Sequence, residues 1–112
     1  MGAAKPTLIQ GTLDMLILTR LARGSEHGFG IAEDVRRRSD EILRIEEGSL
    51  YPALQRLEMQ GLITSQWGMS ENNRRARYYE LTPRGRKQVG LEVSNWRRLV
   101  SAIDRVIDPE VA

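Results

Sequence analysis

The side chains best suited to recognition chemistry lie between residues 49 and 56, where hydroxyl, carboxamide and guanidinium groups alternate with apolar ones. At helical spacing one face is apolar and comprises Leu50, Ala53, Leu54 and Leu57. The other face carries Ser49, Tyr51, Gln55 and Arg56. A helix with an apolar back and a polar, partly cationic front fits the major groove of DNA, where Gln pairs with adenine and Arg with guanine. We therefore expect these four polar residues to contact bases and backbone. The alternative is the solvated face of an ordinary amphipathic helix, and Tyr51 could equally contact a phosphate or pack against the helix start.

A second group of candidates follows between residues 72 and 77, in a stretch rich in arginine and turn formers. The net charge of the whole chain is only +2, but residues 70–87 hold six basic side chains against two acidic ones, a net charge of +4. Such a local positive field suits phosphates, which the guanidinium fork matches well. We expect phosphate or minor-groove contacts from Asn72, Asn73, Arg74, Arg75 and Arg77. The alternative is a solvated hairpin tip, with Arg77 facing the sheet.

A third pattern, near the C-terminus, concerns the pairing of helices. Apolar side chains there follow alternating steps of four and three residues, at Val89, Val93, Trp96, Val100, Ile103 and Ile107. A strict heptad seam is narrower than the apolar face of a globular helix and is typical of helices that pair. We expect this seam to join two copies of the chain across a two-fold axis. The alternative is packing onto the first helix of the same chain, and both can hold in part.

Two helices are predicted near the N-terminus. The first begins with Thr12 as N-cap and Asp14 in its first turn, is buried on most sides, and ends at residues 23–25. The second runs from residue 28 to about residue 39, with apolar side chains at helical spacing on one face and charged ones on the other. These two helices would form the support for the candidate reading helix.

The reading helix itself is predicted from about residue 48 to residue 60. Residues 42–45 lead into it as a short strand or a packed turn. Pro52 falls in its first turn, where the missing N–H costs little. Gly61 ends the helix, because glycine readily adopts the left-handed conformation of a C-terminal cap.

A β-hairpin is predicted next. Residues 62–67 and 76–81 alternate in polarity like strands, and residues 68–75 form a polar, basic turn between them. Three helices followed by a two-stranded hairpin is the order of a winged helix–turn–helix. The predicted fold class is therefore mainly α (α+β), with the hairpin as the wing.

One long helix closes the chain. Thr82 serves as its N-cap and Pro83 as its first residue, and it is expected to continue to about Ile107 and to stop before Pro109. We expect residues 1–82 to form the DNA-binding domain and residues 83–112 to form the dimerisation helix.

Composition excludes several classes of protein. The chain has no cysteine, which excludes disulfides and thiolate metal sites, and its single histidine, His27, is interpreted as a turn residue at the entry to the second helix. No nucleophile-elbow, metallohydrolase or phosphate-loop motif is present, so we expect no enzyme activity, metal or cofactor. No stretch is apolar over the roughly 18 residues that span a bilayer, and no signal-peptide pattern opens the chain. We expect a soluble cytoplasmic protein whose residues 1–5 are a flexible end.

Several motifs in this order resemble the PadR family of bacterial transcriptional regulators. They span about residue 8 to residue 107 and comprise Gly11-Thr12-Leu13-Asp14, His27-Gly28-Phe29-Gly30-Ile31, Glu47-Gly48-Ser49-Leu50-Tyr51-Pro52-Ala53-Leu54, Leu57-Glu58, Ser70-Glu71-Asn72-Asn73-Arg74-Arg75-Ala76-Arg77-Tyr78-Tyr79 and Leu81-Thr82-Pro83-Arg84-Gly85. The single C-terminal helix resembles the compact subgroup of that family. Phe29 departs from the pattern, since tyrosine is commoner there, so the ring keeps its packing but has no hydroxyl to donate.

The resemblance implies a homodimeric repressor whose partner is double-stranded DNA. A dimer of this fold predicts a pseudo-palindromic operator with half-sites about one helical turn apart. The resemblance also implies that a small planar or phenolic effector can relieve repression at the dimer interface, where Trp96 would stack on it. Otherwise Trp96 is simply part of the seam, and Trp67 is expected to be structural.

The alternative function is a winged-helix protein-interaction module without DNA binding, against which the basic hairpin argues.

Overall fold

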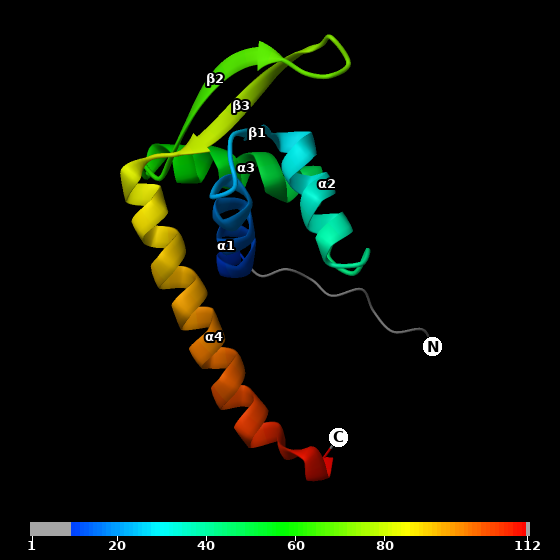
Figure 1. Ribbon diagram of the computed structural model, residues 1–112, viewed down its shortest axis with the longest axis vertical. Coiled ribbons are helices and arrows are strands. Elements are labelled where there is room, and N and C mark those ends of the chain that lie inside the picture. The colour runs from blue at the N-terminus through cyan, green and yellow to red at the C-terminus, as the bar shows by residue number, and fades with distance from the viewer. Residues whose placement is uncertain (1–9, 112) are drawn as a thin grey trace.

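The chain forms three helices, a hairpin and one long helix, which confirms the predicted winged helix–turn–helix fold (Figure 1). The computed structural model describes residues 10–111, so the expectation for residues 1–5 lies outside the described residues. The elements are α1 (Gln10–Leu21), β1 (Glu26–His27), α2 (Gly28–Arg38), α3 (Glu47–Met59), β2 (Ile63–Met69), β3 (Arg75–Leu81) and α4 (Pro83–Val111).

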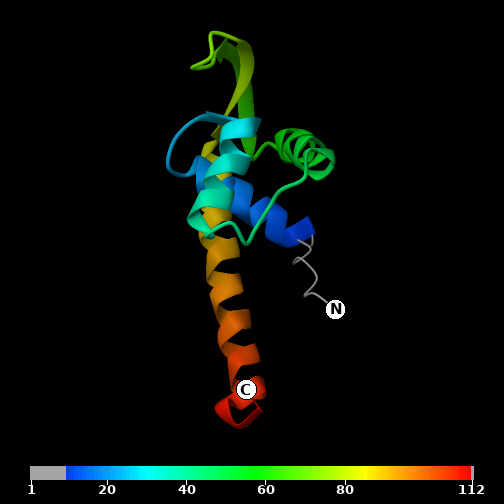
Figure 2. The ribbon, with the colours of Figure 1, turned by 90° about the vertical axis from the view of Figure 1, so that its right-hand side faces the viewer.

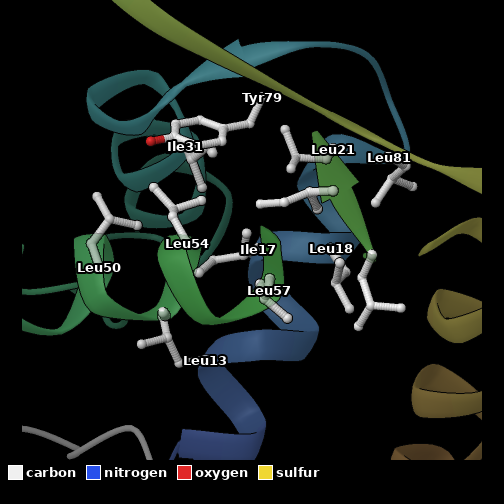
Figure 3. Packing of buried hydrophobic residues seen from close by; sticks show 13 residues of the cluster. Leu13, Ile17, Leu18, Leu21, Ile31, Leu50, Leu54, Leu57, Tyr79 and Leu81 are labelled. Carbon is white, nitrogen blue, oxygen red and sulfur yellow. The ribbon is translucent and has the colours of Figure 1, made fainter. Parts of the chain in front are cut away.

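The core forms where the apolar faces of α1, α2 and α3 meet the base of the hairpin. α3 contributes the face predicted from the sequence, and its four members are each at most 1% exposed: Leu50, Ala53, Leu54 and Leu57. The side chains that meet them include Leu13, Ile17, Leu18 and Leu21 of α1, Ile31 of α2, and Ile63, Tyr79 and Leu81 of the hairpin (Figure 3). Burying one Leu or Ile stabilises the fold by about 1.5–3 kcal/mol. This cluster therefore fixes α3 by its apolar back and leaves the opposite face outside.

The sheet has three antiparallel strands in the order β1-β3-β2. The predicted hairpin is confirmed, with register running from Ile63 opposite Leu81 to Met69 opposite Arg75. β1 is absent from the prediction, because two residues carry no recognisable strand pattern. Its residues Glu26 and His27 pair with β3 and bring the start of α2 to the edge of the wing.

The predicted start of the first helix is wrong. α1 is already helical at Gln10, so Thr12 lies inside the helix and does not cap it. Asp14 is also not a first-turn carboxylate that interacts with the helix terminus. It forms an ion pair with Arg56 of α3, a contact between residues 42 positions apart that no local pattern reveals.

The reading helix begins one residue earlier than predicted, at Glu47, so Pro52 lies in its second turn. At that position proline removes the hydrogen bond to the carbonyl of Gly48, a residue that is exposed and open to water. Gly61 has a φ of +75° and follows the last turn, as expected of a C-terminal cap. Residues 42–45 form neither a strand nor a regular turn; Ile45 packs against the core, whereas Ile42 is exposed.

The start of α4 is capped as predicted. Thr82 Oγ1 accepts a hydrogen bond from the amide of Gly85 at 3.1 Å and donates one to the carbonyl of Gly61 at 2.7 Å. Gly85 is the residue that allows the start of α4 to lie against the turn between α3 and β2, because a Cβ there would overlap the carbonyl oxygen of Leu62.

α4 continues past the predicted stop, to Val111. Pro109 removes only the hydrogen bond to the carbonyl of Arg105, and the helix accommodates this by bending, so that the last turn leaves the axis of the preceding ones (Figure 1). The C-terminal half of α4 extends away from the other elements in both views (Figures 1 and 2), in a molecule that measures 52 × 35 × 21 Å. Neither α4 nor any other helix within residues 10–111 is long and apolar enough to cross a membrane.

Candidate nucleic-acid interface

The polar face of α3 is accessible, with one exception among its four predicted readers. Figure 2 shows α3 nearly end-on, standing to one side of the line formed by the hairpin and α4. Ser49 and Gln55 are exposed, and Tyr51 is 44% exposed. Arg56 is only 30% exposed because its Nη2 donates to the carboxylate of Asp14 on α1. The structure therefore places three of the four side chains outside and engages the fourth in holding α3 on α1.

Tyr51 packs against the beginning of α2 while one side of its ring stays accessible. A Cβ at Gly28 would lie 2.8 Å from the Tyr51 hydroxyl oxygen, so only glycine at position 28 leaves room for the phenol. This contact holds the ring against α2 and turns it toward the hollow described below, of which it forms part.

The entry to α2 is built around His27. Its Nδ1 accepts a hydrogen bond from the amide of Gly30 at 3.0 Å and so caps the helix, which confirms the prediction of a turn residue there. The imidazole meets the ring of Tyr78 edge to face, with 5.2 Å between centroids. Phe29 stands next to it as an exposed aromatic side chain. The histidine thus links α2 to the wing through β1.

The wing, which comprises β2, β3 and their connecting turn (residues 63–81), has a tight tip. The amide of Ser70 donates to the carbonyl of Arg74 at 2.8 Å, and the amide of Asn73 donates to the carbonyl of Ser70 at 2.9 Å. Asn73 has a φ of +59°, a conformation that asparagine tolerates better than most residues. The five predicted phosphate-binding residues are all exposed on this tip and the adjoining strand, namely Asn72, Asn73, Arg74, Arg75 and Arg77.

One face of the wing continues outward from the core and carries Ser65, Trp67, Met69, Arg75 and Arg77; we call it the inner face. Trp67 is 54% exposed, and the guanidinium carbons of Arg75 and Arg77 lie 4.4 and 5.4 Å from its ring centroid. The sequence analysis did not predict this contact between Trp67 and the two arginines, although a hairpin turn centred on residue 72 places position 67 opposite position 77.

The inner face, Tyr51 and the start of α2 enclose a hollow of about 1030 Å³. Arg37 also lines it and was not among the predicted residues; its Nη2 donates to Asp34 at 2.7 Å, and Asp34 is in turn held by Arg20 and Arg38. Arg74, Arg75 and Arg77 form no ion pair with any residue in the described part of the chain. The free positive charge of the hollow therefore comes from the wing.

Tyr79 closes the bottom of this hollow. Its ring is buried, and burial raises the pKa of the phenol above its usual value. Glu58 adds to the rise in this pKa and Arg77 opposes it. At neutral pH the phenol is therefore uncharged.

The predicted heptad seam divides into two parts. Val89 and Val93 are partly buried, and Val89 packs against the core. This half of the seam therefore packs within the chain, which was the alternative to pairing with a second copy. Beyond it the seam faces outward: Trp96 is 41% exposed, and Ile103 and Ile107 are nearly half exposed. Val100 between them is partly buried.

Comparisons with known proteins agree with this architecture. A family model described as the PadR-like family of transcriptional regulators matches residues 17–90. A transcriptional regulator from Clostridium thermocellum is similar in structure, with 33% sequence identity, a TM-score of 0.79 and coverage of 88% of this chain and 93% of that chain. A PadR family transcription regulator from Clostridium difficile R20291 has 30% identity, a TM-score of 0.74 and coverage of 86% and 98%. An uncharacterized protein of Lysinibacillus sphaericus is 28% identical over 97 residues, which are 87% of this chain and 89% of that protein.

Proposed function

Because the chain belongs to the PadR-like family of transcriptional regulators, and is therefore a DNA-binding regulator rather than an enzyme, we propose that it is a homodimeric repressor. The observation that carries the DNA-binding part is that Tyr51, on the exposed face of α3, and the unpaired arginines of the wing line one hollow. A helix with a polar exposed face can enter the major groove of a duplex, while a cationic wing beside it contacts the phosphate backbone. Such a protein would act in the cytoplasm, where it meets chromosomal DNA.

In this proposal α3 enters the major groove. Its 13 residues span about 20 Å, and its exposed side chains Ser49, Tyr51 and Gln55 would meet base edges and nearby phosphates. Arg56 would contribute indirectly, because its ion pair with Asp14 holds α3 on α1. The wing residues Asn72, Asn73, Arg74, Arg75 and Arg77 would contact phosphates or the minor groove, which positions the protein without reading sequence.

The occupant proposed for the exposed half of the seam is a second copy of the chain. The heptad spacing of Trp96, Val100, Ile103 and Ile107 matches itself across a two-fold axis. Trp96, Ile103 and Ile107 are exposed on α4, whose C-terminal half extends away from the other elements (Figure 1). Residues 83–112 would then serve dimerisation and residues 1–82 DNA binding. Two α3 helices one helical turn apart would bind the two halves of a pseudo-palindromic operator.

Regulation is proposed at the same interface. Trp96 presents part of an aromatic ring in the middle of the seam, where a small planar or phenolic effector could stack between two protomers. Such a ligand would favour a spacing of the two α3 helices different from that of DNA and would shift the population away from the DNA-competent state.

A binding experiment tests the proposed function. The full chain is titrated with labelled duplex DNA from upstream of its own gene and with a scrambled duplex of the same length, at several salt concentrations. We expect tighter binding to the upstream duplex, one dimer per site, and weakening with salt. Failure to bind either duplex would instead favour the alternative, a winged-helix protein-interaction module without DNA binding.

A further inference from the structure

Trp67 occupies an unusual place for a large aromatic side chain. It lies on the inner face of the wing but beyond the core, where more than half of its surface is exposed. The buried residues of that face are nearer the base of the wing, at Ile63, Tyr79 and Leu81. Burial in the core therefore does not explain why a tryptophan stands at position 67. The side chains next to it do.

Those neighbours are two guanidinium groups. Arg77 is directly opposite Trp67 in the strand register, and Arg75 is the next residue of β3 on the same face. Both lie within the roughly 6 Å at which an indole attracts a cation. Two like charges on one strand face repel each other, and the negative faces of the indole offset that repulsion.

Arg77 has a second point of attachment, which joins the wing to α3. Its Nε donates to Ser65 Oγ at 2.8 Å, and Ser65 Oγ donates to Glu58 of α3 at 2.7 Å. Nε is thus occupied by the protein, while the terminal nitrogens of the guanidinium have no carboxylate partner among the described residues. Trp67, Ser65 and Glu58 together hold Arg77 in one orientation relative to the reading helix.

We propose that Trp67 is a positioning residue for DNA binding, which holds Arg75 and Arg77 side by side so that both meet phosphates of one strand together. The inference rests on the proposed DNA-binding function. A free arginine side chain loses rotamer freedom when it grips a phosphate, and a side chain already held by the protein loses less. Trp67 would therefore raise affinity without any contact of its own to DNA.

The geometry is tested first without DNA, by fluorescence. All variants carry Trp96→Phe, so that Trp67 is the only tryptophan in a chain that has two. Arg75→Ala is expected to change the emission maximum and the quenching of Trp67 by acrylamide, because it uncovers one face of the indole. Arg74→Ala removes the same charge one residue away and is expected to change neither. Equal spectra for Arg75→Ala and its parent would overturn the proposal, whatever the chain does with DNA.

The functional part is tested by a double-mutant cycle on duplex binding. Trp67→Ala is expected to weaken binding about fivefold in the parent, and by less than about twofold when Arg75 and Arg77 are both alanine. Trp67→Phe is expected to keep most of the affinity, since a phenyl ring also attracts cations. An equal loss from Trp67→Ala in both backgrounds would overturn the positioning role, because the indole would then act without the arginines.

The same cycle separates this inference from the proposed function. The cycle is measured in the chain that keeps Trp96. If this chain binds no duplex, the proposed function fails and the positioning role fails with it, whereas the fluorescence result still reports on the contact. If the parent binds and the cycle is additive, only the positioning role fails.

Discussion

At the scale of single residues, the role of an arginine depends on whether a carboxylate lies within its reach. Arg56 has Asp14, and its guanidinium serves the packing of α3 on α1. Arg75 and Arg77 of the wing have an indole in place of a carboxylate, so their positive charge remains available. The sequence cannot distinguish these cases, because the partner of Arg56 lies 42 residues away.

Arg56 and Gln55 are adjacent, and their substitutions are expected to differ in kind. Arg56→Ala should lower the free energy of unfolding by about 1–3 kcal/mol, because it leaves the partly buried Asp14 without a partner. Gln55→Ala should leave stability nearly unchanged and lower the preference for the operator over scrambled DNA by about 1–3 kcal/mol. Urea denaturation and competition titrations measure the two quantities, with Gln60→Ala, an exposed glutamine at the C-cap of α3, as the control. A loss of operator preference in Arg56→Ala at unchanged stability would restore Arg56 as a base reader.

Tyr79 predicts a pH dependence of stability. Its pKa is raised in the folded chain, so above pH about 10, where an unfolded tyrosine begins to ionise, the folded chain binds more protons than the unfolded one. The stability that Tyr79 provides is therefore complete below pH about 10 and is lost as the pH rises through the pKa of the folded state. Urea denaturation between pH about 9 and 11 should show a smaller loss for Tyr79→Phe than for the parent or for Tyr78→Phe. The same loss in all three proteins would contradict the raised pKa.

At the scale of elements, the features predicted correctly have local causes. The apolar face of α3, Gly61 at its end and Thr82-Pro83 at the start of α4 each depend on residues within one or two turns. Two features that the predictions missed, β1 and the partner of Asp14, depend on contacts from elsewhere in the chain. β1 forms only because β3 is there to pair with it, and Asp14 has a partner on another helix.

The same division applies to the candidate site. Composition and spacing predicted the exposed polar face of α3 and the basic tip of the wing, both of which are surface properties. The contacts of Trp67 depend on strand register, and Arg37 reaches the hollow only because α2 lies beside the wing. These are relations between elements, which residue types alone do not specify.

Gly85 gives a prediction about how two elements fit together. Gly85→Ala should lower the free energy of unfolding by about 1–3 kcal/mol, because its Cβ would overlap the carbonyl of Leu62 and push the start of α4 away from the turn that follows α3. Gly90→Ala on the same helix meets no atom within 4 Å and should stabilise the protein by about 0.5–1 kcal/mol. Thermal or urea denaturation measures both, and a neutral Gly85→Ala would show that the junction can relax.

At the scale of the whole molecule, the exposed half of α4 and the reading surface lie at opposite ends. The wing and α3 lie toward one end of the molecule, and the C-terminal half of α4, with the exposed half of the seam, extends toward the other (Figure 1). An arrangement of this kind lets a contact between two α4 helices set the distance between two reading surfaces. In the proposed dimer, dimerisation and DNA binding would be coupled through α4, which starts at Pro83.

The seam predicts the oligomeric state. Ile103→Glu places a charge in the middle of the proposed interface and should convert a dimer into a monomer at micromolar concentration, as measured by sedimentation velocity. Ser94→Glu adds the same charge on the opposite side of α4 and should leave the dimer intact. A parent chain that is already monomeric would contradict the proposed dimer, and an Ile103→Glu variant that remains dimeric would place the interface elsewhere.

The most direct test of the proposed function is the salt dependence of duplex binding, measured for the parent and for the Arg74→Ala/Arg75→Ala variant. Each protomer would lose two phosphate contacts, so a dimer would lose four. The slope of log K against log salt concentration should therefore become less steep by about 3 to 4. Tyr79→Phe, which removes no charge from the wing, should keep the slope of the parent. Equal slopes for the parent and the double variant would contradict a wing that grips DNA through its arginines.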